Sequence, residues 1–353
     1  GDFCLKNILQ RILPKKNHFM GIDIGSSMVK VAEIKVVSGI PEVTGLRSYP
    51  SPAGVWTDQF DEEALVRALT EVAAPNLKEV VTCIGGEKLI SRIIRLPRMS
   101  DKELEAAARF EVEKFVPVPV DRLIIRQIRL EDDQAAAQDQ KEGENILLLA
   151  VPSATVYQYH SIFSRAGMNL TAIDLKAFAL WRLFARTSAG LLAIVEIGDR
   201  TSNLVVVKDG LIRFTRLLPV GGNMLTNQLM ETYGVEYSSA QQIKEEAAVT
   251  ADAGTEGSPG ESQIREVLRE GLREISRELN RSLDFYSNME NLSVEKLIIS
   301  GGTCKLKGVV AYLQEALELP VEEGTPGINL ADDVQFDPQY SVAIGLALRE
   351  VES

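Results

Sequence analysis

The stretch HFMGIDIGSSMVKVAE, residues 18–33, decides how the rest of the chain is interpreted. Apolar and small residues lead into Asp23, a Gly-Ser-Ser sequence follows, and Met28–Ala32 lead out again. Two such runs joined by a tight, glycine-containing turn predict a β-hairpin. Because Gly25 has no Cβ, the backbone N–H groups of the turn can come close to a phosphate.

Four polar side chains of this hairpin suit a bound phosphate. Ser26 and Ser27 can donate hydroxyl hydrogen bonds, and Lys30 adds a positive charge. Asp23 can hold a cation through the water shell of that cation. An ordinary acidic hairpin has the same composition, so both interpretations are open unless the pattern returns elsewhere in the chain.

Size and composition exclude several classes of protein. A chain of 353 residues is too long for one small core and typical of two domains or lobes. The net charge of −12 argues against a nucleic-acid partner. Three cysteines without a CxxC pair, and two histidines, indicate neither a zinc site nor a disulfide framework. The sequence lacks a run of about 20 apolar residues that could span a bilayer, and no signal peptide is visible, so we expect a cytoplasmic protein.

The first residues form a pattern of their own. Residues 3–16 combine apolar residues at helical spacing with several lysines and arginines, which predicts a short basic amphipathic helix. Contact with an anionic membrane surface or a partner is one interpretation. Docking of a terminal helix on its own domain is the other, and the sequence does not choose between them.

The hairpin pattern returns at LLAIVEIGDRTSNLVVVKDG, residues 191–210. Glu196 stands at the end of an apolar run that predicts a buried strand. Asp23 has the same place in the first hairpin, 173 residues earlier in the chain. The second turn supplies Gly198, Asp199, Thr201 and Ser202. Two copies of a phosphate-type hairpin at half-chain spacing predict two related lobes around a cleft.

A segment that does not repeat the hairpin pattern separates the two copies. Residues 87–168 predict three strands, a helix opened by a capping box at Ser100–Glu103, and a second helix at Ser153–Ala166. We interpret this segment as an inserted α+β subdomain. Its arginines belong either to a solvated face or to a groove for a partner.

These motifs, in this order, resemble those of the actin/Hsp70/sugar-kinase ATPase superfamily, over nearly the whole chain. Asp23–Lys30 resembles the first phosphate loop and Glu196–Ser202 the second. Gln242–Glu245 resembles the adenosine-side helix of actins, and Gly301–Gly308 the adenosine loop. The resemblance implies an α/β, actin-like (ribonuclease H-like) two-lobed ATPase fold with an FtsA-type inserted α+β subdomain.

The resemblance also implies ATP and Mg²⁺ as ligands. Mg²⁺ would lie at Asp23 and Glu196, through water. The residues expected at ATP are Asp23, Gly25, Ser26, Ser27, Lys30, Gly198, Asp199, Thr201, Ser202, Gly221, Gly222, Lys244, Glu245, Gly301, Gly302, Thr303 and Lys305.

The expected domain order follows from the same resemblance. The segments are 1–18 (basic N-terminal segment), 19–86 (first lobe), 87–168 (inserted subdomain), 169–190 (first lobe), 191–223 (second lobe), 224–290 (its outer subdomain), 291–339 (second lobe) and 340–353 (C-terminal helix on the first lobe).

Within the superfamily the sequence looks most like the PilM proteins of type IV pilus assembly. The insertion follows Gly85-Gly86, where FtsA carries its extra subdomain, and Glu103–Pro119, Arg277–Tyr286 and Tyr340–Arg349 support the likeness. We expect no membrane-targeting tail of the FtsA kind. The likeness implies a cytoplasmic adaptor, peripheral at the inner face of the cytoplasmic membrane, beside other pilus platform and motor proteins.

That likeness also implies a peptide partner. The adaptor would bind the cytoplasmic N-terminal peptide of PilN in a groove between the first lobe and the inserted subdomain. Around this groove we expect Arg92–Leu96 and Phe110–Val118.

Two positions depart from the superfamily pattern. Glu196 stands where an aspartate is usual, so its longer side chain would weaken or shift Mg²⁺ binding. Lys176 falls about where actins have the glutamine that orients the attacking water, and a protonated lysine is a poor base. Asp174 and Lys176 are therefore weak catalytic candidates, and we predict ATP binding with slow or no hydrolysis.

Three alternatives remain open at this point. A kinase of the same superfamily would need a catalytic aspartate, for which Asp174 is the obvious candidate. The others are an FtsA-like division protein and the cytoplasmic part of a GspL-type secretion protein, which usually continues into a membrane helix.

Overall fold

The computed structural model describes residues 17–351, except 56, 58–59, 73–78, 85–87, 131–142 and 251–258. The predicted basic helix at residues 3–16 and the Gly85-Gly86 pair therefore lie outside the described residues. None of the described helices is both long and apolar enough to cross a lipid bilayer.

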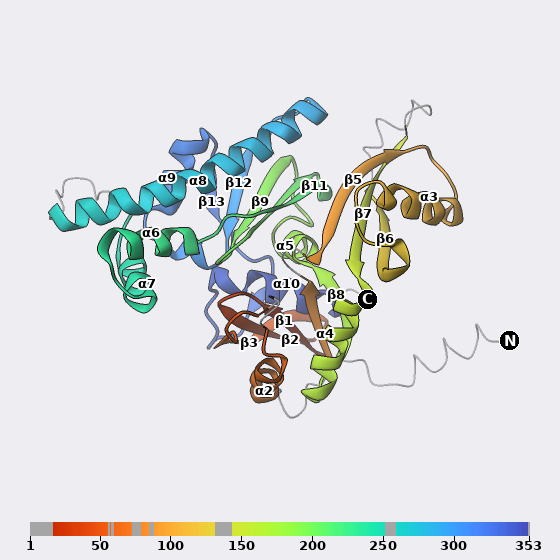
Figure 1. The fold of residues 1–353 in the computed structure, drawn as a ribbon, viewed down its shortest axis with the longest axis horizontal. Helices are drawn as coiled ribbons and strands as arrows, with labels where there is room; N and C mark the ends of the chain where they lie inside the picture. Colours follow the sequence, from red (N-terminus) through yellow and green to blue (C-terminus); the bar gives the residue numbers. More distant parts are fainter. Residues whose placement is uncertain are drawn as a thin grey trace.

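Two β-sheets form the centre of the molecule (Figure 1), and they share one order of five strands, to which the first sheet adds β14 at its edge. The first sheet contains β1 (His18–Ile24), β2 (Met28–Val37), β3 (Ile40–Pro50), β4 (Glu79–Ile84), β8 (Asn169–Leu175) and β14 (Asn329–Leu330). The second contains β9 (Leu191–Ile197), β10 (Ser202–Lys208), β11 (Leu211–Leu218), β12 (Lys296–Ser300) and β13 (Val321–Glu323). The orders are β14-β3-β2-β1-β4-β8 and β11-β10-β9-β12-β13.

The two sheets also share their strand directions. In each, a hairpin of three antiparallel strands is followed by two parallel strands on the other side of the central one. Every residue of β9 is buried, and β1 is buried from Met20 onward, which explains their nearly continuous apolar sequences. The predicted pair of related lobes is confirmed.

Two helices fill the space between the sheets (Figure 1): α5 (Lys176–Phe184) and α10 (Ser341–Val351). They pack on each other, and each contacts the sheet of the other lobe. The helix α5 follows β8 of the first sheet and contacts β9 and β10 of the second, whereas α10 comes after the second sheet in the chain and contacts β1 and β2 of the first. Small residues permit this closeness, because a Cβ on Gly21 would lie 2.0 Å from the Ala343 carbonyl oxygen. A Cβ on Gly345 would lie 2.1 Å from the Ala179 carbonyl oxygen.

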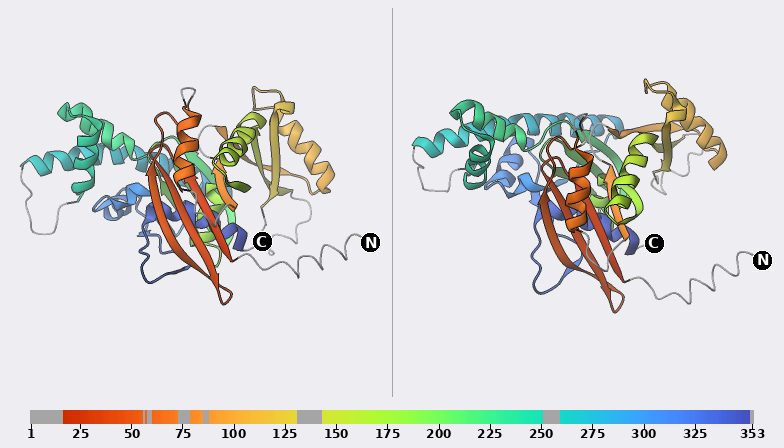
Figure 2. Two further views of the ribbon diagram at one scale, coloured as in Figure 1. Left: turned by 90° about the horizontal axis from the view of Figure 1, so that it is seen from below. Right: turned by 60° about the horizontal axis from the view of Figure 1, so that its bottom comes forward.

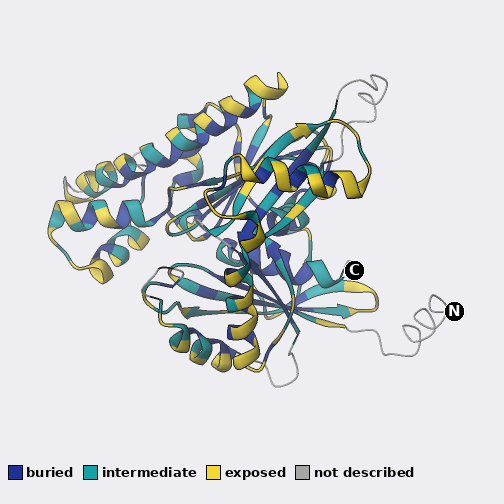
Figure 3. Cartoon of the chain, turned by 45° about the vertical axis from the view of Figure 1, so that its right-hand side comes forward, coloured by how far each residue is buried: buried dark blue, intermediate teal, exposed yellow. Residues whose placement is uncertain are grey.

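The remaining helices cover the outer faces. In the first lobe α2 (Glu62–Val72) packs against α4 (Ser153–Arg165); the second lobe carries α6 (Asn223–Tyr233), α7 (Tyr237–Glu246), α8 (Pro259–Glu290) and α9 (Val309–Leu317). One face of α8 is buried at Leu268, Ile275 and Leu279, and its other face is exposed (Figure 3). Short 3-10 helices span Val120–Arg122, Gly302–Lys305 and Pro338–Tyr340.

The insertion is a small three-stranded sheet with one helix, at the opposite end of the molecule from α6 and α7 (Figure 2). It consists of β5 (Ile90–Leu96), α3 (Asp101–Glu113), β6 (Leu123–Arg129) and β7 (Glu144–Pro152), in the order β5-β7-β6. The expected capping box is present, with Glu103 accepting from the Ser100 backbone N–H at 2.9 Å.

The packing of α4 differs from the sequence interpretation. We expected this helix inside the 87–168 subdomain, but Tyr159, Ile162 and Phe163 lie in the core of the first lobe with Leu65. The insertion by packing therefore ends with β7. The sequence could not show this, because an amphipathic helix does not specify which of two neighbouring cores it covers.

Candidate functional site

The two predicted phosphate hairpins face each other across the lobes. Ser26 Oγ donates a hydrogen bond to Asp199 Oδ2 at 2.9 Å, although the residues are 173 positions apart. Each turn is closed in the same way: Gly25 N donates to the Met28 carbonyl at 3.0 Å, and Gly198 N to the Thr201 carbonyl at 3.1 Å.

Both turns need their glycine. A Cβ on Gly25 would approach the Met28 carbonyl oxygen to 3.0 Å, and one on Gly198 would approach the Thr201 oxygen to 2.8 Å. A side chain at either glycine would therefore crowd a carbonyl oxygen of its own hairpin.

The two predicted acids lie behind the turns at equivalent positions. Asp23 faces Lys30 across its hairpin, and Glu196 faces Asn203 across the other. Lys30 Nζ is 3.3 Å from Asp23 Oδ2, and Asn203 Nδ2 donates to Glu196 Oε2 at 2.9 Å. Both acids are buried, with side-chain exposures of 1% and 4%.

Lys176, at the start of α5, joins the two acids. Its ammonium nitrogen is 3.2 Å from Asp23 Oδ1 and 3.8 Å from Glu196 Oε2. We call this arrangement of Asp23, Lys176 and Glu196 the lysine bridge. Because Asp23 and Lys176 belong to the first lobe and Glu196 to the second, the bridge connects the lobes.

The electrostatics of the lysine bridge keep Asp23 and Lys176 ionised. Burial alone would raise the pKa of Asp23, but the positive charges of Lys176 and Lys30 outweigh burial and lower it to about 2. For Lys176, burial would lower the pKa, but Asp23 and Glu196 raise it above the ordinary lysine value.

The Cys83 thiol completes the surroundings of Asp23, to whose Oδ1 it donates at 3.7 Å. Burial and the nearby Asp23 charge raise the pKa of this thiol well above its usual value. Cys83 is therefore a neutral donor and not a reactive thiolate.

Two further glycines, Gly221 and Gly222, lie beside the second turn. Gly222 N donates to the Gly198 carbonyl at 2.8 Å, and a Cβ on Gly222 would meet Thr303 Oγ1 at 2.4 Å. Lys244 Nζ donates to the Gly222 carbonyl at 3.3 Å, and burial lowers the pKa of this lysine. A Cβ on Gly221 would lie 2.4 Å from the Asp199 carbonyl oxygen.

The adenosine-type loop has one constrained and one open glycine. Gly301 has φ +94°, and a Cβ there would lie 2.5 Å from the Ile197 carbonyl oxygen. At Gly302 a Cβ would meet no atom within 4 Å. Open space beside bare backbone is what a flat ligand group requires.

Several predicted site residues make hydrogen bonds or ion pairs within the protein. The Ser202 hydroxyl is buried and donates to the Val220 carbonyl at 2.7 Å, so it supports the hairpin instead of facing a phosphate. Lys305 pairs with Asp337 at 2.7 Å and is half exposed. Glu245 accepts from Gln241 at 2.7 Å. Ser27 and Thr201 contribute backbone carbonyls to turn hydrogen bonds.

Asp174 does not have the environment of a catalytic base. Its Oδ2 is 2.5 Å from Arg182 and 3.3 Å from Arg349, and its Oδ1 accepts from the Leu175 backbone N–H at 2.8 Å. The carboxylate therefore serves a buried ion pair that ties α5 and α10 to β8.

Sequence reasoning missed two polar residues of the site. Asn203 holds Glu196, and Ser51 Oγ donates to the Gly25 carbonyl at 2.7 Å. The first could have been found, because Asn203 follows Glu196 by seven positions as Lys30 follows Asp23. For Ser51, which directly follows β3, the sequence holds no such signal.

The lysine bridge does not fit the predicted Mg²⁺ site. Mg²⁺ needs octahedral oxygen ligands and usually keeps several waters beside one or two carboxylates. At Asp23 and Glu196 an ammonium group already lies between the two carboxylates. Across the described part of the chain, no three or more His, Cys, Asp and Glu side chains form a group that could hold a metal.

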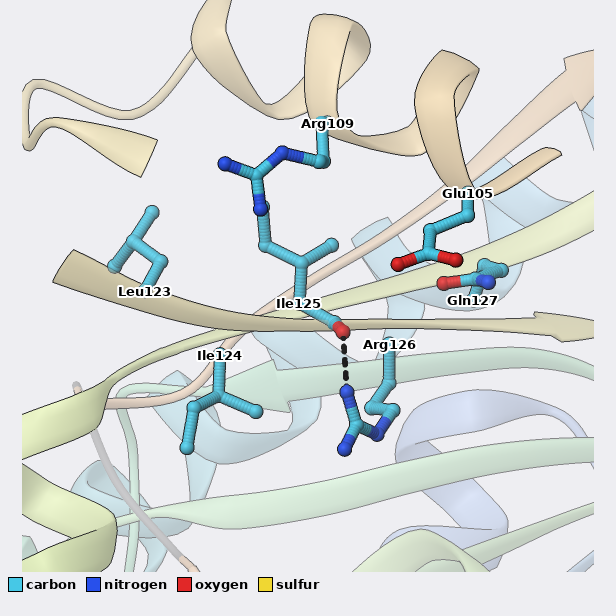
Figure 4. Close-up of a pocket in the computed structure, with 7 residues that line it drawn as sticks. All are labelled: Glu105, Arg109, Leu123, Ile124, Ile125, Arg126 and Gln127. Carbon is cyan, nitrogen blue, oxygen red and sulfur yellow. Dashed lines mark hydrogen bonds between the residues drawn. The ribbon is translucent and has the colours of Figure 1, made fainter. Parts of the chain in front are cut away.

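A pocket of about 230 Å³ lies between α3 and the edge strand β6 of the insertion (Figure 4). Glu105 and Arg109 of α3 face Leu123–Gln127 of β6 there. Elsewhere in the insertion Phe110 is exposed, and Arg92 on β5 stacks on Phe115, with 5.0 Å between the guanidinium carbon and the ring centre.

Known proteins resemble the chain in sequence and in fold. It is 24% identical to the cell division protein FtsA of Pseudomonas aeruginosa, over 93% of this chain and 88% of that protein. FtsA of Bacillus subtilis is 21% identical, over 93% and 82%. The solved structure of a PilM-PilN type IV pilus biogenesis complex matches with a TM-score of 0.82 and 25% identity, over 96% of this chain and all of that one.

More distant structures share only the fold. MreB5 of Spiroplasma citri bound to ADP matches with a TM-score of 0.53 and 13% identity, over 94% of this chain and 95% of that chain. The actin-like fold is thereby confirmed. The model of the family "Type IV pilus assembly protein PilM" matches residues 21–351, so this chain belongs to the PilM family of type IV pilus assembly proteins.

Proposed function

We propose that this chain is an ATP-binding adaptor of the type IV pilus assembly platform, with slow or no hydrolysis. It would work at the inner face of the cytoplasmic membrane and link the platform to the cytoplasmic motor. The observation that carries nucleotide binding is the pair of facing glycine turns, connected by Ser26 and Asp199 at 2.9 Å. Backbone N–H groups of such turns suit the phosphates of a nucleotide.

Slow hydrolysis follows from the position of Lys176. Its ammonium group is held by two buried carboxylates and remains protonated, so it cannot accept a proton from water. Asp174 is engaged by two arginines. Neither candidate offers a free base.

We further propose that the partner is the cytoplasmic N-terminal peptide of PilN, bound beside the insertion. A solved relative is a PilM-PilN complex. In this chain the edge strand β6 pairs only with β7 among the described strands, and its pocket exposes apolar and charged side chains. An extended peptide can bind to such an edge through main-chain hydrogen bonds.

The first experiment measures ATP binding by calorimetry, with and without a peptide copying the cytoplasmic start of the cognate PilN, alongside phosphate release. We expect binding of ATP and of peptide with negligible release. Turnover of about 1–100 s⁻¹ without any partner, as in working kinases, would contradict the adaptor.

A second experiment tests where ATP binds. Gly302→Leu fills the open space at the adenosine-type loop without meeting a protein atom through its Cβ, so the fold should survive. We expect at least a tenfold loss of ATP affinity and an unchanged melting temperature. The matched control is Gly260→Leu on α8, where a Cβ also meets nothing within 4 Å. Equal ATP affinity in both variants would exclude this location.

A further inference from the structure

The charges behind the phosphate turns balance without any metal ion. Asp23 and Glu196 contribute two negative charges, and Lys30 and Lys176 contribute two positive charges within 3.8 Å of them. A divalent cation added to this group would meet a neutral cluster that contains two ammonium groups. Two unpaired carboxylates would be a far better site.

The position of Lys176 matters as much as its charge. Lys30 forms its ion pair with Asp23, from within the same hairpin. Lys176 lies between acids of different lobes, where a metal shared by the two phosphate hairpins would lie. Its side chain is only 14% exposed, and the Ser26–Asp199 contact connects the same two turns.

We propose that Lys176 takes the place of the divalent cation in this chain: its ammonium group joins the two lobes behind the nucleotide phosphates, and ATP binds without Mg²⁺. This inference rests on the proposed nucleotide binding and adds its cation requirement. The ammonium group is tethered to α5, so it does not have to be recruited from solution with each nucleotide.

Two carboxylates hold Lys176 in place, and each carboxylate accepts a hydrogen bond from another side chain. Asp23 and Glu196 attract the ammonium from β1 and β9, and Asn203 fixes the Glu196 carboxylate from β10. Cys83 on β4 also donates to Asp23. The geometry therefore restrains the lysine to the gap between the two acids.

The test compares ATP affinity with excess Mg²⁺ and with EDTA, by calorimetry on the whole chain. Wild-type protein should change by less than about threefold, which is less than 1 kcal/mol at 1.4 kcal/mol for each factor of ten. Lys176→Met removes the charge and should lose at least tenfold in affinity when Mg²⁺ is withdrawn. Lys176→Gln does the same while keeping a hydrogen-bond donor for the buried acids, in case the methionine variant fails to fold.

A matched control removes a paired lysine elsewhere. Lys296 pairs with Glu322 at 2.7 Å on the second sheet, away from the lysine bridge. Lys296→Met should remain independent of Mg²⁺, as the wild type is.

Direct metal binding provides a readout that does not depend on catalysis. Free Mn²⁺ measured by electron paramagnetic resonance should not fall when nucleotide-free wild-type protein is added, but should fall with Lys176→Gln. Mn²⁺ binding by the wild type would overturn the proposal.

The calorimetric outcomes separate this proposal from the one on which it rests. Wild-type ATP binding that is lost in EDTA overturns the role of Lys176 but leaves nucleotide binding in place. Binding that is equal in wild type and Lys176→Gln under both conditions also overturns it. Failure to bind ATP under either condition overturns both proposals.

Discussion

At the scale of single residues, a substitution of Asp174 tests whether this residue has a structural or a catalytic role. Arg182 and Asp174 side chains are each only 6% exposed, so Asp174→Asn removes a negative charge that faces a buried guanidinium. We expect a loss of about 3 kcal/mol in the free energy of unfolding, from the range for breaking a buried pair. Urea denaturation measures it. A variant of normal stability that loses only a phosphoryl-transfer activity would support the kinase alternative.

Asp23 makes the protein sensitive to acid. Its folded pKa is lowered from 3.8 to about 2, so its contribution is complete above pH ~4 and is lost as the pH falls through about 2. The shift corresponds to about 2 kcal/mol. Urea titrations between pH 5 and 2 should show a steeper loss for wild type than for Asp23→Asn. Parallel curves would contradict this assignment.

The residues of the site show where sequence reasoning succeeds. Gly25 and Gly198 are recognisable because a turn and its flanking strands are local in the sequence. The ion pairs of Asp174 depend on α10, which lies far along the chain, and no local pattern announces them. The location of Lys176 could be aligned with a family position, but only the folded chain brings it within reach of Glu196.

At the scale of elements, the contact of α10 with α5 leaves no room for a side chain at Gly345. Gly345→Ala would place a methyl group 2.1 Å from the Ala179 carbonyl oxygen, and the backbone cannot move aside cheaply. We expect a loss of about 3 kcal/mol in stability, at the upper part of the range for overpacking.

Gly260→Ala is the control for the effect of glycine itself. Its Cβ meets nothing within 4 Å, and alanine in a helix is more stable than glycine by up to about 1 kcal/mol. Thermal unfolding of both variants measures the difference. Similar melting temperatures would mean that the two helices separate more easily than the contact implies.

The elements were otherwise well predicted where their signals are strong. The C-terminal helix expected within residues 340–353 spans Ser341–Val351, and the helix expected at Gln242–Glu245 is part of α7. The exception is α4. Its boundaries were nearly right, but we expected it to pack in the inserted subdomain, and it packs in the core of the first lobe. Its amphipathic pattern specifies an apolar face, and only tertiary packing specifies the core which that face joins.

At the scale of the whole molecule, nucleotide and peptide should influence each other. The insertion is connected to the first lobe. If ATP favours one arrangement of the two lobes, the affinity of the peptide site depends on that arrangement. We expect ATP to raise peptide affinity about fivefold or more, and the peptide to raise ATP affinity by the same factor. Calorimetry in both orders checks the equality. Peptide affinity that is the same with and without ATP would leave a scaffold without a switch.

The packing of α10 on the first sheet has a consequence during protein synthesis. The face of β1 and β2 is covered by α10, which leaves the ribosome after every other described strand and helix. At about 5–20 residues per second, roughly 15 to 60 seconds pass between the end of β1 and the start of α10. During that interval the nascent first lobe carries an uncovered apolar sheet face, and slower translation prolongs its exposure to aggregation and to chaperones.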